Sequence, residues 1–284
     1  MGDVPYNQTE EYLLQGVIER MNREDLAFVL HAGDIKNGRE PCTEQLFERR
    51  KSILQRSHHA LVLVPGDNEW TDCRRPQAGG YDPLERLEAL RRIFFSGDMS
   101  LGQAPMRLQR QSALDPRYSE YRENVRWTAH GIVFVGLNVP GGNNNIGMHD
   151  EYLRRSDADI AWLDEAAALA AKPEAKALVV LMQANLYIWN RFRRAADVPD
   201  GYAALREALE RHTLRLKKPV LLVHGDTHMY SVDHPLRDPA SGKRVETFTR
   251  VEVFGSPVVN WIKVTALAGG AGGFRIQPGP ADNF

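Results

Sequence analysis

Residues 60–73 read ALVLVPGDNEWTDC, and this stretch is the most informative about the fold because it joins a predicted buried strand to a group of polar side chains. Its first part, Ala60–Val64, is a continuous apolar run with the length of a strand, and Gly66-Asp67 follows after a single proline. Uniformly apolar strands are typical of sheets that are covered on both faces. The stretch therefore predicts a layered domain with a carboxylate at a strand end.

Other apolar runs along the chain have the same character. We expect strands at Ala27–His31, Gly131–Leu137, Ala177–Met182, Pro219–His224 and Arg250–Phe254. Apolar side chains recur at helical spacing in four segments, Thr9–Arg23, Thr43–Arg56, Asp82–Phe95 and Asp157–Lys172. In the third, Asp82 is the expected N-cap and Pro83 lies in the first turn. The segment SVDHPLRDPASGK (231–243) is rich in turn residues. Strands that alternate with helices predict one layered α/β domain over residues 1–284.

Polar side chains follow these runs at the points where the strands should end. The apolar runs lead into Gly33-Asp34, Gly66-Asp67, Gln183 and Gly225-Asp226, and Gly2-Asp3 opens the chain. Ligands of open α/β sheets bind beyond the carboxyl ends of the strands, so we expect these groups to converge. One Gly-Asp is ordinary turn chemistry, but three directly behind apolar runs favour a shared site. Crowded carboxylates repel unless they bind protons or cations, and oxygen ligands suit Mg, Mn or Fe.

The order of these motifs resembles the calcineurin-like metallophosphoesterases, whose strand ends carry D-x-H, G-D, G-N-H-[DE], a lone His and G-H-x-H. The similarity runs from Gly2 to about Val264, and GDNEWTDC (66–73) resembles the form found in a bacterial subgroup. The resemblance implies a sandwich of two mixed β-sheets flanked by helices. It also implies a hydrolytic site with two divalent ions, for which Mn, Mg or Fe is expected and Zn is an alternative.

The resemblance assigns metal ligands residue by residue. Asp3 matches the first ligand, Asp34 matches the bridging carboxylate, and His228 matches the last histidine. Three further ligands are replacements, with Asp67 at the usual Asn, Gln183 at the lone His and Asp226 at the first His of the last motif. Asp34, His228 and Asn68 are the expected catalytic residues, and the amide of Asn68 would contact the phosphoryl group.

The replacements change the expected chemistry. Asn68 stands where the family has the His that protonates the leaving group, and an amide cannot act as that acid. The sequence leaves this acid open among His31, His149, His224 and Tyr6.

The charge of the site also affects which substrate it attracts. The four aspartates carry −4 in total, which would cancel the positive charge of two divalent ions and weaken the attraction for a phosphate dianion. This favours a diester or a less charged substrate, or a single metal. The expected activity is hydrolysis of a phosphate mono- or diester by a metal-bound hydroxide. The alternative is a protein that binds metal or ligand without turnover.

Composition excludes several classes of partner. The 284 residues carry a formal net charge of −1, so nothing global attracts the chain to nucleic acid or to an anionic membrane. No apolar run approaches the roughly 20 residues that span a bilayer. The expected partner is a small phosphoester, which Arg74 and Arg75 can bind. The oligomeric state is not predicted.

Three features concern covalent bonds and the start of the chain. Cys42 and Cys73 follow two strand-end loops, so they can form a disulfide if those strands are neighbours. The family has a strand before its first Asp, whereas only Met1 and Gly2 precede Asp3. We therefore expect that a first strand is missing, which would expose a sheet edge or leave a gap in the core. No signal peptide is visible, but a missing segment and a disulfide would both suit an exported protein.

Overall fold

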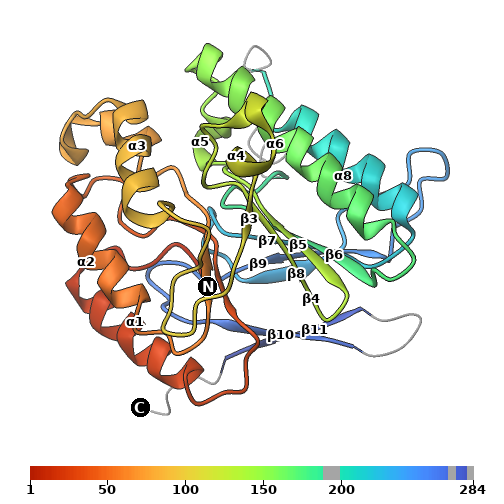
Figure 1. Ribbon diagram of the computed structural model, residues 1–284, viewed down its shortest axis with the longest axis horizontal. Coiled ribbons are helices and arrows are strands. Elements are labelled where there is room, and N and C mark those ends of the chain that lie inside the picture. Colours follow the sequence, from red (N-terminus) through yellow and green to blue (C-terminus); the bar gives the residue numbers. More distant parts are fainter. Residues whose placement is uncertain (188–198, 268–272, 280–284) are drawn as a thin grey trace.

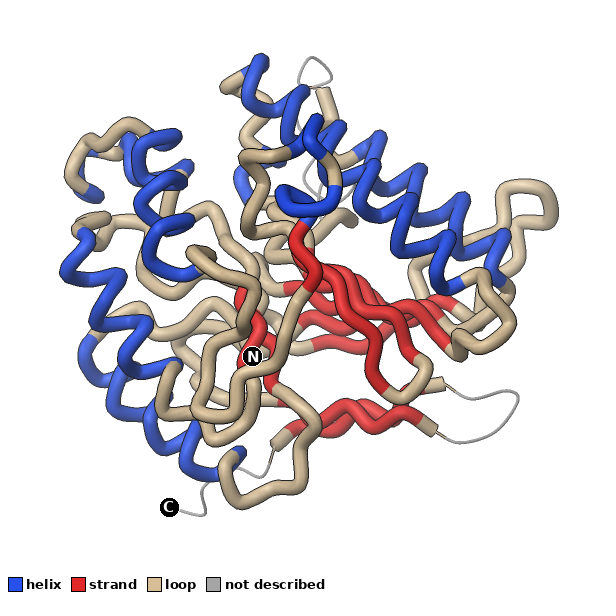
Figure 2. Tube along the Cα trace, viewed as in Figure 1, coloured by secondary structure: helices blue, strands red, loops and turns tan. Residues whose placement is uncertain are grey.

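A mixed sheet of seven strands forms the centre of the computed structural model, which describes residues 1–187, 199–267 and 273–279 (Figures 1 and 2). From one edge to the other its strands are β3 (Gln109–Arg110), β4 (Val125–Ala129), β5 (Ile132–Gly136), β6 (Ala177–Leu181), β7 (Val220–His224), β9 (Phe248–Glu252) and β8 (Ser231–Asp233). The inner strands β5, β6, β7 and β9 run parallel, and the pairs at both edges are antiparallel. The carboxyl ends of the parallel strands therefore lie at one edge of the sheet.

Two pairs of strands form a thinner second layer. The parallel pair is β1 (Val29–His31) with β2 (Leu61–Leu63), and the antiparallel pair is β10 (Ile262–Ala266) with β11 (Phe274–Pro278). Val62 and Val64 share a hydrophobic core with Phe134, Val179 and other side chains on the facing side of the large sheet. The predicted layered α/β class is confirmed, although the second layer consists of two small sheets and not of one mixed sheet.

Helices cover both layers (Figure 1). The helices α1 (Gln8–Met21), α2 (Glu44–Leu54) and α3 (Pro83–Phe94) pack on the outer side of β1 and β2. The helices α6 (His149–Ala170) and α8 (Ala203–Leu216) pack on the outer side of the large sheet. The shorter elements are η1 (Thr71–Arg74), η2 (Pro76–Ala78), α4 (Gln111–Leu114), η3 (Pro116–Tyr118) and α5 (Gly141–Asn144). Within the described part of the chain, every helix is too short or too polar to cross a membrane.

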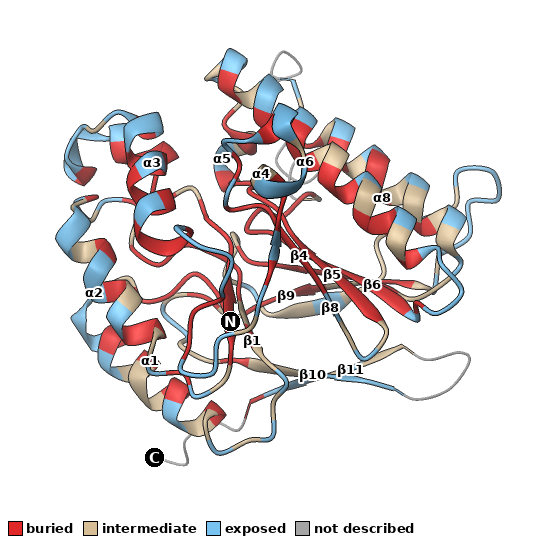
Figure 3. Ribbon diagram, viewed as in Figure 1, coloured by how far each residue is buried: buried red, intermediate tan, exposed pale blue. Residues whose placement is uncertain are grey.

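Alternating side chains explain why the inner strands are buried on both faces. In β6, Val179 faces the core between the layers, whereas Leu178 and Val180 face the core beneath α6 and α8. Figure 3 shows this burial along the central strands and the greater exposure of β10 and β11. The central strands are therefore covered on both faces, as their uniformly apolar sequences predict.

Most predicted elements match those in the structure, with two corrections. The Asp82 side chain accepts hydrogen bonds from the backbone N–H groups of Leu84 and Glu85, both at 2.9 Å, so the predicted cap of α3 is confirmed. The helix expected from residue 157 begins at His149, because the first turn already carries acidic residues that favour a helix N-terminus. The turn-rich segment contains β8, which exists through its pairing with β9 and not through local propensity.

Candidate metal centre

The strand ends bring three predicted site residues into direct contact. Asp34 follows β1, and its Oδ1 accepts a hydrogen bond from the backbone N–H of Asn68 at 3.0 Å. Its Oδ2 accepts from the Asn68 side-chain amide at 2.8 Å and from the Gln183 amide at 3.3 Å. Asn68 follows β2 and Gln183 follows β6, so the Asp34 carboxylate lies where the two layers meet.

The residues near the two ends of the sequence form the other half of the site. The Oδ1 of Asp3 accepts a hydrogen bond from the backbone N–H of Asp226 at 3.1 Å and lies 3.8 Å from the Nε2 of His228. The hydroxyl of Tyr6 joins the halves, because it lies 3.2 Å from His228 Nε2 and 3.0 Å from Asp34 Oδ2. It also accepts a hydrogen bond from the Asn68 amide at 2.9 Å.

Asp67 and Asp226 converge on Gly141, at the start of α5. A Cβ atom on Gly141 would lie 2.9 Å from Asp67 Oδ1 and 2.7 Å from Asp226 Oδ1, so a larger residue would push into both carboxylates. The backbone N–H of Gly141 donates to Gln183 Oε1 at 2.5 Å. The structure thus brings all six sequence-predicted ligands to one region, including the Gln183 and Asp226 replacements.

Four of the predicted ligands have strained backbones. The φ angles of Asp3, Asp34, Asp226 and His228 are 52°, 55°, 80° and 60°, in the left-handed region that residues other than glycine rarely adopt. Such strain costs free energy and persists only where the surrounding structure enforces it, which is typical of functional sites. The turns therefore hold these side chains in place at a cost to stability.

Burial and mutual repulsion disfavour the charged forms of these carboxylates. Burial, with a smaller contribution from neighbouring negative charges, raises the pKa of Asp3, Asp34 and Asp67 well above the usual range. Burial likewise raises the pKa of Asp226 to about 6. Each carboxylate would be easier to ionise beside a cation.

The donor set fits a hard divalent ion, although the ligands are not preformed. Among the described residues, no three or more His, Cys, Asp or Glu side chains are grouped closely enough to hold a metal. However, Asp3 Oδ2 is buried, and no other described residue forms a hydrogen bond with it. An unpaired buried oxygen among crowded carboxylates is the chemistry that a Mg- or Mn-like cation would satisfy.

Of the candidate acids, the structure places only Tyr6 in contact with the predicted ligands. His31 and His224 are fully buried, and burial lowers the pKa of each to about 3, so both imidazoles are neutral at pH 7. His149 is the first residue of α6 and is exposed. The sequence named Tyr6 but could not place it, because its position depends on contacts with residues far along the chain.

Two buried charged residues support the site and were missed by the sequence analysis. The Oε1 of Glu69 accepts hydrogen bonds from the backbone N–H of Asp34 at 3.1 Å and of Gly66 at 2.8 Å, so it ties the two Gly-Asp turns together. The ammonium of Lys36 donates to the backbone oxygen of Asn68 at 2.7 Å. The signal for Glu69 was its place inside the GDNE motif, whereas an interior position for Lys36 has no local signal.

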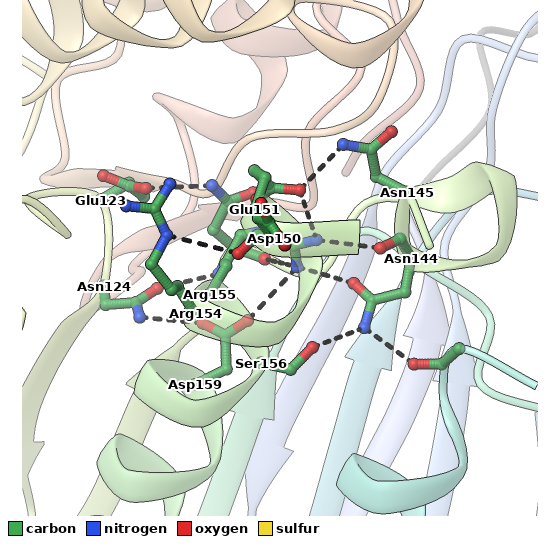
Figure 4. A network of polar contacts seen from close by, with 12 residues as sticks. Glu123, Asn124, Asn144, Asn145, Asp150, Glu151, Arg154, Arg155, Ser156 and Asp159 are labelled. Atoms are coloured by element: carbon green, nitrogen blue, oxygen red, sulfur yellow. Dashed lines mark hydrogen bonds and ion pairs between the residues drawn. The ribbon is translucent and has the colours of Figure 1, made fainter. Parts of the chain in front are cut away.

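A buried arginine positions the loop that carries Gly141 (Figure 4). The guanidinium of Arg155 in α6 donates to the Asn144 side chain at 2.6 Å, to the Asn144 backbone oxygen at 2.9 Å and to Glu151 at 2.6 Å. Asn145 in turn donates to Glu151 at 2.8 Å. Because residues 143–145 all have positive φ, these bonds fix a backbone that would otherwise be unfavourable.

The disulfide and the arginines lie beside the same loops. Cys42 and Cys73 form a disulfide with a Cα–Cα distance of 5.8 Å, as the sequence predicted. Arg75 pairs with Asp72 at 2.5 Å, and Gly38 lies against both Arg75 and Asn68, so Arg75 is near the site. Arg74 donates to Asn145 at 3.3 Å. Both arginines are exposed and can meet an anionic substrate.

The comparisons with known proteins agree with the layered α/β fold. The family model for calcineurin-like phosphoesterases matches residues 4–230, so the chain belongs to this family. A solved structure of PhoD aligns with a TM-score of 0.56 at 17% identity, which shows similarity of fold alone. The alignment covers 87% of this chain and 54% of that one, so the chain spans about half the length of PhoD. No protein of curated function matches significantly.

Proposed function

We propose that the chain hydrolyses phosphate esters with the aid of divalent metal ions bound among Asp3, Asp34, Asp67, Gln183, Asp226 and His228. Membership of the calcineurin-like phosphoesterase family supports metal-dependent phosphoester hydrolysis in general. The observation that carries the finer proposal is the meeting of strand-end side chains around Asp34 and Asp3. These side chains come from distant parts of the sequence, and simple turn chemistry does not explain their convergence.

The residues divide into two ligand sets that share Asp34. Asp3 and His228 would hold one ion, since their side chains lie 3.8 Å apart. Asp67, Asp226 and Gln183 would hold the second around Gly141. When bound, such ions supply Lewis acidity toward phosphoryl oxygens and make a water molecule more acidic.

The chain's own polar groups would orient the substrate. The side-chain amide of Asn68 donates a hydrogen bond to Asp34. It can donate to a phosphoryl oxygen instead when a substrate binds. The Tyr6 hydroxyl lies on the same side of Asp34 and can donate to an oxygen of the phosphoryl or leaving group. Arg75, beside Asn68, adds a positive charge at the edge of the site.

Charge favours a substrate with few negative charges. Asp3, Asp34, Asp67 and Asp226 together carry −4 when ionised, which would cancel two divalent ions. A phosphomonoester dianion would gain little attraction from a neutral centre, whereas a diester carries one charge. We therefore propose a diester or another phosphoester of low charge as the substrate class.

Hydrolysis of p-nitrophenyl phosphate and bis-p-nitrophenyl phosphate with Mn or Mg tests the proposal. We expect turnover by the wild type, a higher kcat/KM for the diester, and a loss of at least about 100-fold in Asp34→Asn. Asp98→Asn is the matched control, because that carboxylate is 51% exposed and pairs with Arg107. Equal turnover by wild type and Asp34→Asn would refute the assignment of Asp34.

The same assay, combined with metal analysis, separates catalysis from binding without turnover. The replacement of the expected leaving-group acid by Asn68 favours that second possibility. Bound metal together with no turnover of either ester would support a binding protein. A protein that takes up no divalent ion would contradict both metal-dependent hydrolysis and metal binding, and would leave only the binding of another ligand.

A further inference from the structure

Glu10 is a buried carboxylate that joins two segments of the candidate metal centre. It lies in the first turn of α1 and is 4% exposed. Its Oε2 accepts a hydrogen bond from the backbone N–H of Tyr6 at 2.7 Å, and its Oε1 accepts one from the hydroxyl of Ser256 at 2.8 Å. Because 246 positions separate Glu10 from Ser256, the carboxylate ties the start of α1 to the turn between β9 and β10.

Helix capping explains only part of this arrangement. Asn7 is the N-cap of α1, and its side chain accepts a hydrogen bond from the backbone N–H of Glu10 at 3.0 Å. A glutamate three residues after an N-cap commonly bonds back to the chain before the helix. The bonds that Glu10 accepts from the Asn7 side chain at 2.8 Å and from the Tyr6 backbone belong to this local role. The bond from Ser256 does not, since a cap needs no partner so far along the chain.

The turn that carries Ser256 lies against two predicted ligands. The backbone N–H of Ser256 donates to the backbone oxygen of Asp3 at 3.0 Å. A Cβ atom on the neighbouring Gly255 would lie 2.7 Å from Asp3 Cβ and 2.8 Å from His228 Cγ, so the turn packs closely on both side chains. A shift of this turn would therefore change the positions of Asp3 and His228.

The carbonyl of Ser256 also selects the tautomer of His228. The Nδ1 of His228 lies 2.8 Å from the backbone oxygen of Ser256. A carbonyl oxygen can only accept a hydrogen bond, so Nδ1 carries the hydrogen and Nε2 of the neutral ring keeps its lone pair. The same Nε2 lies 3.8 Å from Asp3 Oδ1 and 3.2 Å from the Tyr6 hydroxyl. The nitrogen that can bind a metal therefore faces the site.

Glu10 reaches the same place from the side of Tyr6. Its bond to the Tyr6 N–H restrains the backbone of a residue whose hydroxyl lies 3.0 Å from Asp34 Oδ2. The Tyr6 ring packs edge-on against the His228 ring, with 5.3 Å between the ring centroids. One carboxylate thus holds Tyr6 directly and holds His228 through Ser256.

We propose that Glu10 and Ser256 are positioning residues of the metal centre, which keep the Nε2 lone pair of His228 and the Tyr6 hydroxyl turned toward Asp3 and Asp34. The inference rests on the proposed function in one respect, because it takes Nε2 as an atom that meets a divalent ion. Partners that orient a metal-binding histidine through its other nitrogen fix the tautomer and the direction of the ring. Glu10 should therefore affect the state of the His228 ring, which a residue that only caps a helix would not.

NMR of the metal-free protein, labelled with ¹⁵N in histidine, tests the positioning role without any turnover. The spectrum shows which ring nitrogen carries the hydrogen, and His228→Gln identifies the signals of that ring. We expect the Nδ1–H form in the wild type. In Ser256→Ala and in Glu10→Gln we expect a mixture of both tautomers, and amide exchange at Ser256 that is faster by roughly tenfold. Glutamine is a suitable replacement because its single acceptor oxygen cannot serve both Tyr6 and Ser256.

Two control variants accompany this measurement. Ser256→Thr keeps the hydroxyl, so it should keep the wild-type tautomer and exchange rate. Asp82→Ala removes the N-cap of α3 and should lower Tm by a few degrees, as the loss of a helix cap does. It should leave the His228 ring unchanged.

The affinity for Mn gives a second measurement. Loss of a group that orients a metal-binding histidine typically weakens metal binding by about 10- to 100-fold. We expect the Kd for Mn to rise about tenfold in Glu10→Gln and in Ser256→Ala. The double variant should bind Mn about as weakly as either single variant, because both substitutions break the same hydrogen bond.

The outcomes separate this proposal from the proposed function. A wild-type tautomer and wild-type exchange at Ser256 in both Glu10→Gln and Ser256→Ala would overturn the positioning role, even if the wild type hydrolyses phosphoesters with Mn. An equal change of the His228 ring in Asp82→Ala would also overturn it, because the effect would then follow from lost stability alone. If the wild type takes up no Mn but the tautomer still depends on Glu10 and Ser256, the positioning role stands and metal-dependent hydrolysis fails.

Discussion

At the residue scale, the Tyr6 hydroxyl is the contact that joins the two halves of the site. It lies within 3.2 Å of both Asp34 and His228, and it accepts from Asn68. Tyr6→Phe removes these hydrogen bonds and leaves the ring in place. We expect kcat for bis-p-nitrophenyl phosphate to fall by about 10- to 100-fold, since one buried hydrogen bond is worth roughly 1–3 kcal/mol.

The control for this prediction is Tyr12→Phe, because Tyr12 is 77% exposed on α1. Metal content should be measured for both variants. An unchanged kcat in Tyr6→Phe with normal metal content would show that the hydroxyl has no part in turnover.

A second residue-scale prediction concerns the buried Asp159 in the network around Arg155 (Figure 4). Burial raises the pKa of this carboxyl from 3.8 to about 8, although Arg155 and Asn124 oppose the rise. The folded protein therefore keeps a proton that the unfolded chain loses, and stability should fall as pH rises from about 4 to about 8. We expect Asp159→Asn to flatten this decline by a few kcal/mol.

Urea unfolding at several pH values measures the effect. Asp157→Asn is the control on the same helix, because Asp157 is exposed. Parallel pH profiles of the wild type and Asp159→Asn would contradict a raised pKa at Asp159.

At the scale of elements, the disulfide ties the loop after β1 to η1 after β2. The loop after β1 carries Asp34, and η1 directly follows the turn with Asp67. The bond therefore restrains both turns. In the chain-entropy model, a bridge across 31 residues stabilises the fold by about 3–4 kcal/mol. We expect Cys42→Ser with Cys73→Ser to lower the free energy of unfolding by that amount and to weaken Mn binding.

Thiol titration of the denatured wild type without reductant decides whether the bond forms. Two reactive thiols would contradict the disulfide, and reduced wild type should unfold at the same urea concentration as the double variant. Because such bonds persist in oxidising compartments, we also propose that the protein functions outside a reducing cytosol.

Element-scale patterns also explain what the sequence could predict. Continuous apolar runs identify β1, β2, β5, β6, β7 and β9, because the central strands are buried on both faces. Helical periodicity identifies α1, α2, α3 and α6, because each of these helices buries one face. Gly-Asp turns behind strands indicate where Asp34, Asp67 and Asp226 gather. By contrast, β8 and β10 are partly exposed, and they depend on partners elsewhere in the chain.

Tertiary contacts account for the parts of the site that the sequence could not provide. Glu69 and Arg155 act by bonding backbone groups of distant turns, and no local pattern distinguishes them from surface charges. Tyr6 belongs to the site because its hydroxyl contacts Asp34 and His228, which lie 28 and 222 positions further along the chain. Sequence reasoning therefore places the strand ends but not the side chains that support them.

At the scale of the whole molecule, the proposed metal site connects segments near the start of the chain with segments near its end. Asp3 bonds Asp226, and Asp34 bonds Gln183, so a cation there would link β1 of the thinner layer to β6 and β7 of the large sheet. A ligand that binds only the folded state stabilises it, by about 2.7 kcal/mol at one hundred times its Kd. We expect saturating Mn to raise Tm by about 5 °C over EDTA-treated protein.

The Asp226→Asn variant makes this prediction specific to carboxylate repulsion. Without metal it should melt a few degrees above the wild type, because burial raises the pKa of Asp226 to about 6 and the charged form is unfavourable in the folded state at pH 8. With Mn it should gain less than the wild type, because one ligand is lost. Asp98→Asn should follow the wild type under both conditions. If Mn shifts Asp226→Asn and the wild type equally, the aspartate does not bind the ion, and the link between the two layers does not depend on metal at that position.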